Sequence, residues 1–393
     1  MEYYFIEIEN FIMKKQILEY PENIQDKVIY LLQDGKRLRP ILCIIFSGLE
    51  NTTNINNTQE LYQNKSNNKS NNNSNNNLEK NISDDENKIL IYNISSFVEQ
   101  IHCLSLVLDD LPEMDNDSMR RGKQSFHSKY NIDYTNFFLY YMFNRLFLSL
   151  NSILDTYIDI NLNININPKN NKILNNNLNY AKKIKKILSI NLNMLIDGQY
   201  NDLTLQDSSS CFLENPSHKE DVNTPEIKII FSLLEKHILE SNDLILQIIS
   251  NIELNMKKTS SLFNLSICSG FIIQLWINKH NFERFNDIYE KLSIWSNILG
   301  YMFQVSDDVL DIDDDKAKGN PNICQIIGKD TTHILLKNGC DWLFENIKLI
   351  IIECNMTNMN MDVNNNINNN KIVFNLDAIK EIIDKILKRI EMN

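Results

Sequence analysis

The stretch IYNISSFVEQIHCLSLVLDDLPEMD, residues 91–115, decides the fold. Up to residue 108 its apolar side chains recur at intervals of three and four residues, which is the spacing of one face of an α-helix. Pro112 cannot continue such a helix, because it lacks the backbone N–H that the next turn needs. The sequence therefore predicts a long buried helix that ends at Asp109 and Asp110 and then turns.

The same helical spacing governs residues 295–311 and the C-terminal stretch 374–390. No part of the sequence alternates polar and apolar residues over the length of a strand. Glycine (9) and proline (7) are scarce, which disfavours an architecture of many strands and tight turns. We therefore predict an all-α fold.

Three tracts interrupt this pattern, at residues 51–88, 160–178 and 355–372, where asparagine dominates. Such tracts cannot bury enough apolar surface to offset the entropy lost on ordering. We interpret them as disordered low-complexity insertions at the surface of a single domain that spans residues 1–393.

Charge and cysteine usage narrow the class of protein. The net charge of −12 disfavours nucleic acid and anionic membranes as partners. The seven cysteines are dispersed, which is typical of reduced thiols. No secretory signal opens the sequence, and the most apolar stretch, residues 137–150, is too short to cross a bilayer. We expect a cytoplasmic protein without a transmembrane segment, or one from a plastid-type organelle if an N-terminal extension has been removed.

The first acidic motif follows the helix that ends at Asp109. The turn forced by Pro112 can return Asp115 to the side of Asp109, and converging carboxylates form an all-oxygen site suited to Mg²⁺. A solvated acidic loop is the simpler interpretation. The apolar helix before the motif and the pair Arg120-Arg121 after it argue against plain surface.

A second acidic motif holds Asp307, Asp308 and Asp311. Asp307 and Asp311 are one helical turn apart, so their side chains share a face. Like charges at that spacing repel, and an unpaired arrangement indicates that a cation is held there.

Basic residues accompany the two acidic motifs. GKRLRP at 35–40 places three cations within four positions, a density suited to a phosphate group. His102 shares a helical stripe with Asp109, although a lone histidine is equally often a core residue. Lys257-Lys258-Thr259 offers cations at a predicted helix start. The whole set indicates two polyanionic substrates, one bound through metal and one through Arg and Lys.

Five motifs, taken in order, resemble the trans-polyprenyl diphosphate synthases, the family of farnesyl and geranylgeranyl diphosphate synthases. They are GKRLRP at 35–40, EQIHCLSLVLDDLPEMDNDSMRRGK at 99–123, GQYNDL at 198–203, KKTSSLF at 257–263 and GYMFQVSDDVLD at 300–311. The resemblance implies a helical bundle of the isoprenoid synthase type around a central cavity. It also implies a homodimeric enzyme that condenses an allylic prenyl diphosphate with isopentenyl diphosphate.

The resemblance implies residue roles as well, with three Mg²⁺ ions per active site. Metal binding would fall to Asp109, Asp110, Asp115, Asp307, Asp308 and Asp311. The allylic diphosphate would contact Arg120, Lys258 and Lys329. Isopentenyl diphosphate would contact Gly35, Lys36, Arg39, His102 and Arg121. Thr259 and Gln304 would line the space where the carbocation forms.

The sequence departs from the family pattern after the second acidic motif. Lys329 is assigned through Gly328-Lys329-Asp330-Thr331, but the aspartate that the family has before it is missing or displaced, and residues 318–322 align poorly. The sequence therefore leaves open whether the loop at 316–329 closes over the site.

Chain length of the product is expected to depend on the residue five positions before the first aspartate. A bulky aromatic there limits products of this family to fifteen carbons, whereas this sequence has Leu104 followed by Ser105. We predict a geranylgeranyl product, with farnesyl or longer products as alternatives.

Other functions are open at this stage. A non-catalytic partner subunit should have lost aspartates, but both motifs are intact. A terpene cyclase or a squalene-synthase-like enzyme would not need the basic pair Lys36 and Arg39. A Ca²⁺-binding protein would need a twelve-residue loop of alternating oxygen ligands, and none occurs in this sequence.

Overall fold

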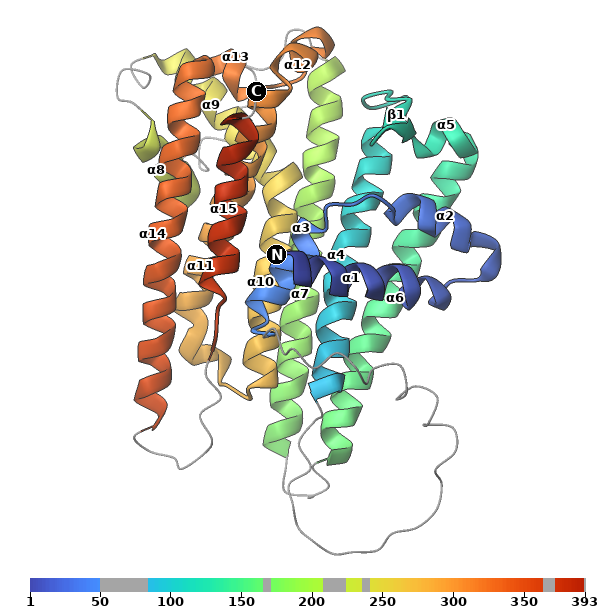
Figure 1. Cartoon of the computed structure of the whole chain (residues 1–393), viewed down its shortest axis with the longest axis vertical. Helices are drawn as coiled ribbons and strands as arrows, with labels where there is room; N and C mark the ends of the chain where they lie inside the picture. Colours follow the sequence, from blue (N-terminus) through green and yellow to red (C-terminus); the bar gives the residue numbers. More distant parts are fainter. Residues whose placement is uncertain (50–83, 165–170, 208–223, 235–240, 363–371, 392–393) are drawn as a thin grey trace, which may run out of the picture.

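The computed structural model describes residues 1–49, 84–164, 171–207, 224–234, 241–362 and 372–391. These residues form an all-α protein, as the sequence predicts (Figure 1). The strands of the described part are β1 (Met119–Arg120) and β2 (Lys123–Gln124), which pair as one short antiparallel hairpin.

The helices follow one another along the chain with these bounds. The α-helices are α1 (Glu2–Lys14), α2 (Glu22–Leu32), α3 (Leu38–Phe46), α4 (Asp84–Asp109), α5 (Phe126–Tyr130), α6 (Ile132–Ile164), α7 (Asn171–Asp207), α8 (Pro225–Leu233), α9 (Asn242–Asn255), α10 (Ser261–Ile277), α11 (Asn286–Leu310), α12 (Ile312–Lys318), α13 (Ile323–Ile327), α14 (Lys329–Asp362) and α15 (Leu376–Glu391). Short helical turns of other types are η1 (Gln16–Glu19), η6 (Met256–Ser260) and η7 (Phe282–Phe285).

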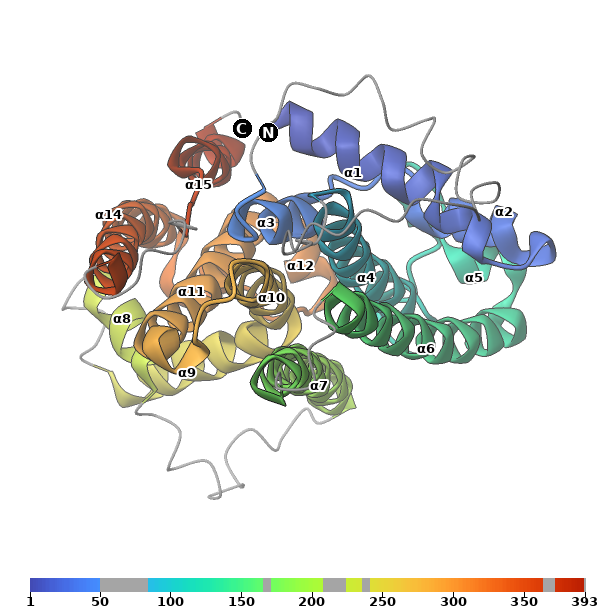
Figure 2. The same ribbon diagram turned by 90° about the horizontal axis from the view of Figure 1, so that it is seen from below.

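Helix α10 forms the centre of the bundle. Its side chains are buried from Ser261 to Trp276, and it packs against α3, α4, α7 and α11 (Figure 2). A Cβ at Gly270 would lie 2.4 Å from the backbone oxygen of Cys43, so only glycine permits α3 to approach this closely. The continuous helical stretch Asn242–Ile277 is long and apolar enough to cross a membrane, but 94% of its most apolar window is buried inside this bundle.

One end of the bundle gathers the helix ends that carry the motifs. Helix α4 ends there at Asp109, and α7, α11 and the short α12 reach the same end (Figure 1). The start of α4, the end of α6, the start of α7 and the end of α14 all lie toward the opposite end. The long helices therefore hold the acidic motifs together at one pole.

The C-terminal helix closes one side of the bundle. Helix α15 packs its apolar face, which includes Ile379, Ile382 and Ile386, against α11 and α14. The N-terminal amine of Met1 lies 3.2 Å from the carboxylate of Glu381 on the same helix. This packing brings the end of α15 to the second acidic motif.

The structure corrects the bounds of the asparagine-rich tracts. Residues 84–88, 160–164, 171–178 and 355–362 fell within the predicted disordered insertions, yet they belong to α4, α6, α7 and α14. Tertiary contacts overcome the poor composition here: the indole N–H of Trp276 donates to Oδ1 of buried Asn177 at 2.9 Å. The remainder of the predicted insertions, residues 51–83, 165–170 and 363–371, lies outside the described residues.

Candidate active site

The first acidic motif folds back on itself at the end of α4. The backbone N–H of Asp115 donates to the carbonyl oxygen of Asp109 at 2.9 Å, and that of Asn116 donates to Leu111 at 3.0 Å. Asn116 takes a left-handed conformation (φ 52°), which asparagine tolerates better than most residues. The turn predicted after Pro112 is therefore present, and it returns Asp115 to Asp109.

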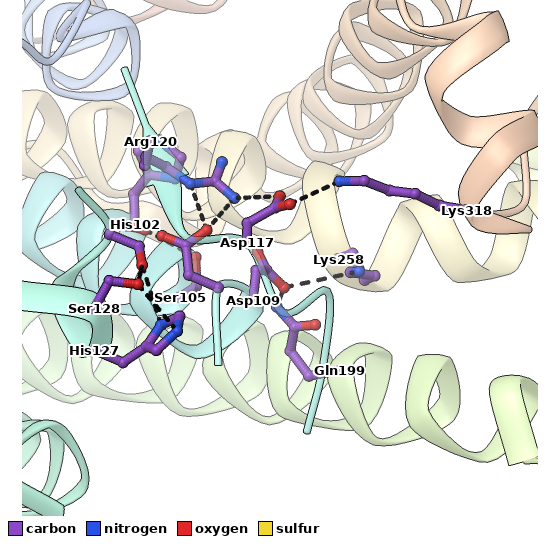
Figure 3. A network of polar contacts seen from close by, with 12 residues as sticks. His102, Ser105, Asp109, Asp117, Arg120, His127, Ser128, Gln199, Lys258 and Lys318 are labelled. Carbon is purple, nitrogen blue, oxygen red and sulfur yellow. Dashed lines mark hydrogen bonds and ion pairs between the residues drawn. The ribbon is translucent and has the colours of Figure 1, made fainter. Parts of the chain in front are cut away.

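Asp109 is the point where three helical elements meet. The amide Nε2 of Gln199, on α7, donates to its Oδ1 at 2.7 Å, and Nζ of Lys258, in η6, lies 3.9 Å from the same oxygen (Figure 3). Sequence reasoning gave no role to Gln199, although GQYNDL was among the motifs of the resemblance. The helix end, the amide and the ammonium group hold this carboxylate at the rim of the bundle.

Asp110 faces the protein interior. Its side chain is 2% exposed, and Nε of Arg120 donates to its Oδ1 at 2.6 Å. Burial raises the pKa of this carboxyl to about 6, while the guanidinium of Arg120 opposes the rise. Asp110 is thus the counterion of Arg120, and its role as a metal ligand stays a prediction: adjacent residues on a helix point about 100° apart, so Asp109 and Asp110 face different sides.

The hairpin β1–β2 positions Arg120 and Arg121. Arg121 and Gly122 have φ of 52° and 76°, as the two central residues of a tight hairpin turn require. Arg120 therefore points to Asp110 and lies 3.9 Å from Asp117, whereas Arg121 is exposed and donates to the carbonyl oxygen of Gln33 at 3.3 Å.

Lys258 and Thr259 lie in a π-helical turn and not at a helix start. The turn η6 joins α9 to α10 without a break in the helical run. A Cβ at Gly198 would lie 2.9 Å from the backbone nitrogen of Lys258, and a Cβ at Gly300 would lie 2.6 Å from the Cα of Ser260. Helices α7 and α11 therefore press on the turn from two sides, and π turns of this kind often mark functional sites.

The second acidic motif has a resident cation. The guanidinium of Arg389, near the end of α15, pairs with the carboxylate of Asp307 and donates to Oγ of Ser306 at 2.9 Å. It also lies 4.6 Å from the ring centroid of Phe303. Burial raises the pKa of Asp307, and Arg389 opposes that rise. The sequence-based expectation of an unpaired carboxylate at Asp307 was therefore wrong.

Asp308 is buried and fully engaged. Its Oδ2 accepts the backbone N–H of Ile323 at 2.8 Å, and its Oδ1 accepts Nε2 of Gln304 at 2.9 Å. Burial raises its pKa to about 7. These partners anchor Asp308 in the scaffold, and its role as a metal ligand stays a prediction. Asp311 is exposed instead, and its backbone N–H closes the last turn of α11 on the carbonyl of Asp307 at 2.9 Å.

The basic set around residues 35–39 combines one exposed and one buried cation. Lys36 is exposed, whereas Arg39 is buried, donates toward Nε2 of His102 at 3.1 Å and lies 4.9 Å from the ring centroid of Phe263. Burial lowers the pKa of Arg39 to about 10, so it stays charged at neutral pH. Burial, followed by Arg39, lowers the pKa of His102 well below its ordinary value, and a neutral imidazole can accept from Arg39.

Arg37, which sequence reasoning left without a role, anchors this basic loop. It is buried, with Nε 2.6 Å from Glu9 and Nη1 2.9 Å from buried Glu99. A Cβ at Gly35 would lie 2.1 Å from Nη1 of Arg37, so glycine is required beside it. Gly35 therefore serves the packing of the loop, and its contact with isopentenyl diphosphate stays a prediction alongside those of Lys36 and Arg39.

The remaining predicted residues are dispersed around the same pole. Lys329 is exposed at the first position of α14, after Gly328 with φ of 80°. Leu104 is fully buried on α4, five residues before Asp109, and Oγ of Ser105 donates to the carbonyl of His102 at 2.8 Å.

Two sets of contacts connect the acidic motifs. Lys258 approaches Asp109, while its neighbour Thr259 donates through Oγ1 to Oε1 of Gln304 at 2.8 Å, one turn before Asp308. On the outside, Nζ of Lys318 on α12 lies 2.8 Å from Asp117 (Figure 3). These contacts link the two acidic motifs at one pole of the bundle.

The donor set fits magnesium, although the described residues hold no cluster of three or more His, Cys, Asp or Glu side chains placed to bind an ion. Mg²⁺ commonly uses one or two carboxylates and completes its shell with water and substrate phosphate oxygens. Asp109 and Asp115 at one motif, with Asp307 and Asp311 at the other, offer hard oxygen ligands of that kind.

Comparison with known proteins agrees with this geometry. The family model for polyprenyl synthetase matches residues 21–220. The chain is 27% identical over 246 residues to a farnesyl diphosphate synthase of Buchnera aphidicola (62% of this chain and 64% of that one). It is 25% identical over 317 residues to a chloroplastic geranylgeranyl pyrophosphate synthase of Capsicum annuum (80% and 59%). The chain thus spans less than two thirds of the length of these curated relatives.

Solved structures share the fold at low sequence identity. A geranyltranstransferase from Thermotoga maritima matches with a TM-score of 0.55 at 16% identity, covering 98% of each chain. A geranyltransferase from Helicobacter pylori, complexed with magnesium and isoprenyl diphosphate, matches with a TM-score of 0.54 at 15% identity, covering 100% of this chain and 97% of that one. With the family model matching about half of its length, this chain belongs to the polyprenyl synthetase family.

Proposed function

We propose that this protein condenses an allylic prenyl diphosphate with isopentenyl diphosphate and releases pyrophosphate, in a reaction that depends on Mg²⁺. The observation that carries the proposal is the double contact of the π turn. Lys258 approaches Asp109 of the first acidic motif, and Thr259 donates to Gln304 of the second. Both acidic motifs can therefore hold the same diphosphate group, while it is bound and while it departs.

The residues divide the chemistry between them. Asp109, Asp115, Asp307 and Asp311 would hold Mg²⁺, and three ions per site is the number that we propose. Bound Mg²⁺ supplies positive charge that stabilises the departing diphosphate. Lys258, Arg120 and Lys329 would orient the allylic diphosphate and neutralise part of its charge.

The second substrate would bind on the opposite side. Lys36, Arg39 and Arg121 are cations available to the diphosphate of isopentenyl diphosphate, with neutral His102 fixing the direction of Arg39. Thr259 and Gln304 would line the space where the allylic cation forms, and apolar helix walls would exclude water from it. We propose that the released pyrophosphate accepts the final proton.

For the product we propose geranylgeranyl diphosphate. Leu104 is buried on α4 five residues before Asp109, where a smaller side chain than tyrosine leaves a deeper cavity floor. The named relatives include both farnesyl and geranylgeranyl diphosphate synthases, so the alternatives are a farnesyl or a longer product. Product analysis with labelled isopentenyl diphosphate decides between them: Leu104→Tyr should shorten the product, and an unchanged product would contradict this role.

For the assembly we propose a homodimer that forms through α6. This helix exposes Phe137 (77%), Tyr140 (75%) and Leu148 on one stripe, together with half-exposed Tyr141. An apolar patch of this kind is typical of a contact surface, and a two-fold axis would pair it with itself. Light scattering of the wild type and of Phe137→Glu tests this: the variant should be monomeric.

The test of the activity uses the full chain, geranyl diphosphate and isopentenyl diphosphate. We expect pyrophosphate release only when both substrates and Mg²⁺ are present. Release without isopentenyl diphosphate would instead indicate a cyclase. No release at all would favour a non-catalytic partner subunit.

A further inference from the structure

Three side chains form a directed chain of hydrogen bonds between the second acidic motif and the π turn. Oγ1 of Thr259 lies 2.8 Å from Oε1 of Gln304, and Nε2 of the same amide lies 2.9 Å from Oδ1 of Asp308. The other carboxylate oxygen, Oδ2, accepts the backbone N–H of Ile323 at 2.8 Å. Both oxygens of this buried carboxylate are therefore in use, each for a different partner.

The direction of this chain follows from the chemistry of its first member. The NH₂ of Gln304 faces Oδ1 of Asp308, the orientation that an ionised carboxylate requires because it only accepts hydrogen bonds. The carbonyl oxygen of Gln304 then faces Thr259, and the hydroxyl must donate to it. The hydroxyl proton of Thr259 is thereby engaged by Gln304, and the lone pairs of Oγ1 point away from Gln304.

The surroundings show that this arrangement is specific to Thr259. A hydroxyl inside a helix commonly donates to the carbonyl four residues earlier. Ser261, two positions later, does so, with Oγ 2.7 Å from the carbonyl oxygen of Lys257. Thr259 donates across to α11 instead. It lies between the acidic motifs, because its neighbour Lys258 approaches Asp109 and its partner Gln304 comes three residues before Asp307.

We propose that Asp308 is a positioning residue that sets the polarity of the Thr259 hydroxyl through Gln304. Thr259 then presents oxygen lone pairs, and not its proton, to the positive charge that develops on the allylic substrate. This inference rests on the proposed function and gives Asp308 a role in it that needs no contact with metal. Fixed dipoles of this kind stabilise a transition state because they require no reorganisation during the reaction.

The loop after the motif has its own anchors, which separates the two tasks of Asp308. Nδ2 of Asn322 donates to the backbone oxygen of Asp308 and to Oδ2 of Asp315, both at 2.8 Å. Oδ1 of Asn322 caps α13 by accepting from Cys324 at 2.8 Å. The loop therefore depends on Oδ2 of Asp308 and on Asn322, and Oδ1 of Asp308 serves Gln304.

The substitution Asp308→Asn should reverse the direction of the hydrogen-bond chain and preserve the anchors of the loop. The new amide can still accept from Ile323 through its oxygen, and its NH₂ then faces Gln304. Gln304 must rotate, which turns its own NH₂ toward Thr259 and directs the hydroxyl proton elsewhere. We expect kcat to fall by about tenfold to a hundredfold, while KM for both substrates stays within about twofold.

A double-mutant cycle with Thr259→Val separates this role from a structural one. Thr259→Val should lower kcat by a similar factor, and the double variant should be no slower than the slower single variant, because the effect of Asp308 passes through the hydroxyl. Thr259→Ser keeps the hydroxyl and should keep the sensitivity to Asp308→Asn. If Asp308→Asn does not fold, Gln304→Leu takes its place in the cycle.

The matched control is Asn322→Ala, which loosens the same loop without touching the chain of hydrogen bonds. The reductions in kcat caused by Asn322→Ala and by Thr259→Val should multiply in the double variant. If the kcat reductions of Asp308→Asn and Thr259→Val multiply in the double variant of an active enzyme, the positioning role is wrong and the proposed function stands. The same holds if Asp308→Asn leaves kcat unchanged or changes only KM. An inactive wild-type protein overturns the proposed function, and the positioning role with it.

Discussion

The two acidic motifs are alike in sequence and differ in how the structure holds them. At the first, the chain leaves α4 and turns back, so that Asp115 returns to Asp109. At the second, the chain stays helical to Leu310, and the guanidinium of Arg389 pairs with the carboxylate of Asp307. In both, the second aspartate of the pair is buried, 2% exposed, and bound to protein groups. The comparison teaches that each pair commits one carboxylate to the scaffold, and we propose that the other serves the ligand.

The largest expected effect comes from breaking this division at the first motif. Asp109→Asn should lower kcat/KM by on the order of a thousandfold, because the charge that faces the leaving group is lost. Asp110→Asn should cost far less activity, since its carboxylate faces Arg120. Steady-state kinetics of the two variants make the comparison. Equal losses would contradict the assigned division.

The scaffold carboxylate at the first motif depends on one cation. Arg120→Ala leaves Asp110 buried without its counterion, so the free energy of unfolding should fall by about 3 kcal/mol. Adding Asp110→Asn should recover most of that loss, since the uncompensated charge is removed. Urea denaturation of the single and double variants measures it. No recovery in the double variant would show that Arg120 acts through packing alone.

The π turn joins the two motifs, and crowding it should disturb both. A Cβ at Gly300 would meet the Cα of Ser260, which is backbone and cannot move aside, so Gly300→Ala should destabilise the protein by about 2 kcal/mol. Gly339→Ala is the matched control, because its Cβ would meet the flexible side chain of Met302 and should cost less. Thermal unfolding ranks the two variants, and the reverse order would argue against a clamped turn.

The smallest expected effect concerns the ion pair between Arg389 and Asp307 in the second motif. Arg389→Ala removes the group that Mg²⁺ must displace from Asp307, so Mg²⁺ should bind the substrate-free protein up to about fivefold more tightly, the range of a partly exposed ion pair. Lys388→Ala removes an exposed charge from the same helix and should have no such effect. Isothermal titration with Mg²⁺ tests this, and equal affinities in both variants would refute competition at Asp307.

Local patterns predicted much of the fold and the location of the site. The apolar spacing of residues 91–108 and the block at Pro112 are properties of adjacent residues, so α4 and the turn back to Asp109 follow from sequence alone. The arrangement of the helices in one bundle followed from the resemblance. The helical content of the asparagine-rich tracts did not, because contacts such as Trp276 with Asn177 are tertiary.

The partners of the aspartates could not be predicted, because they depend on packing between distant elements. Arg389 lies 82 residues from Asp307 and belongs to no motif; only the docking of α15 brings the two together. Neighbouring aspartates look equivalent in a sequence, although the helix turns one of them inward. The π turn likewise has no sequence pattern of its own, since Gly198 and Gly300 on other helices press on it.

The separation of the two poles of the bundle has a consequence for how this chain tolerates change. A helix of 26 residues, the length of α4, spans about 39 Å. The asparagine-rich tracts attach where α4 begins, where α6 and α14 end and where α7 begins, at the pole away from Asp109 and Asp307. Sequence gained or lost at these junctions therefore lies far from Asp109, Lys258 and Gln304 and need not change the distances among them.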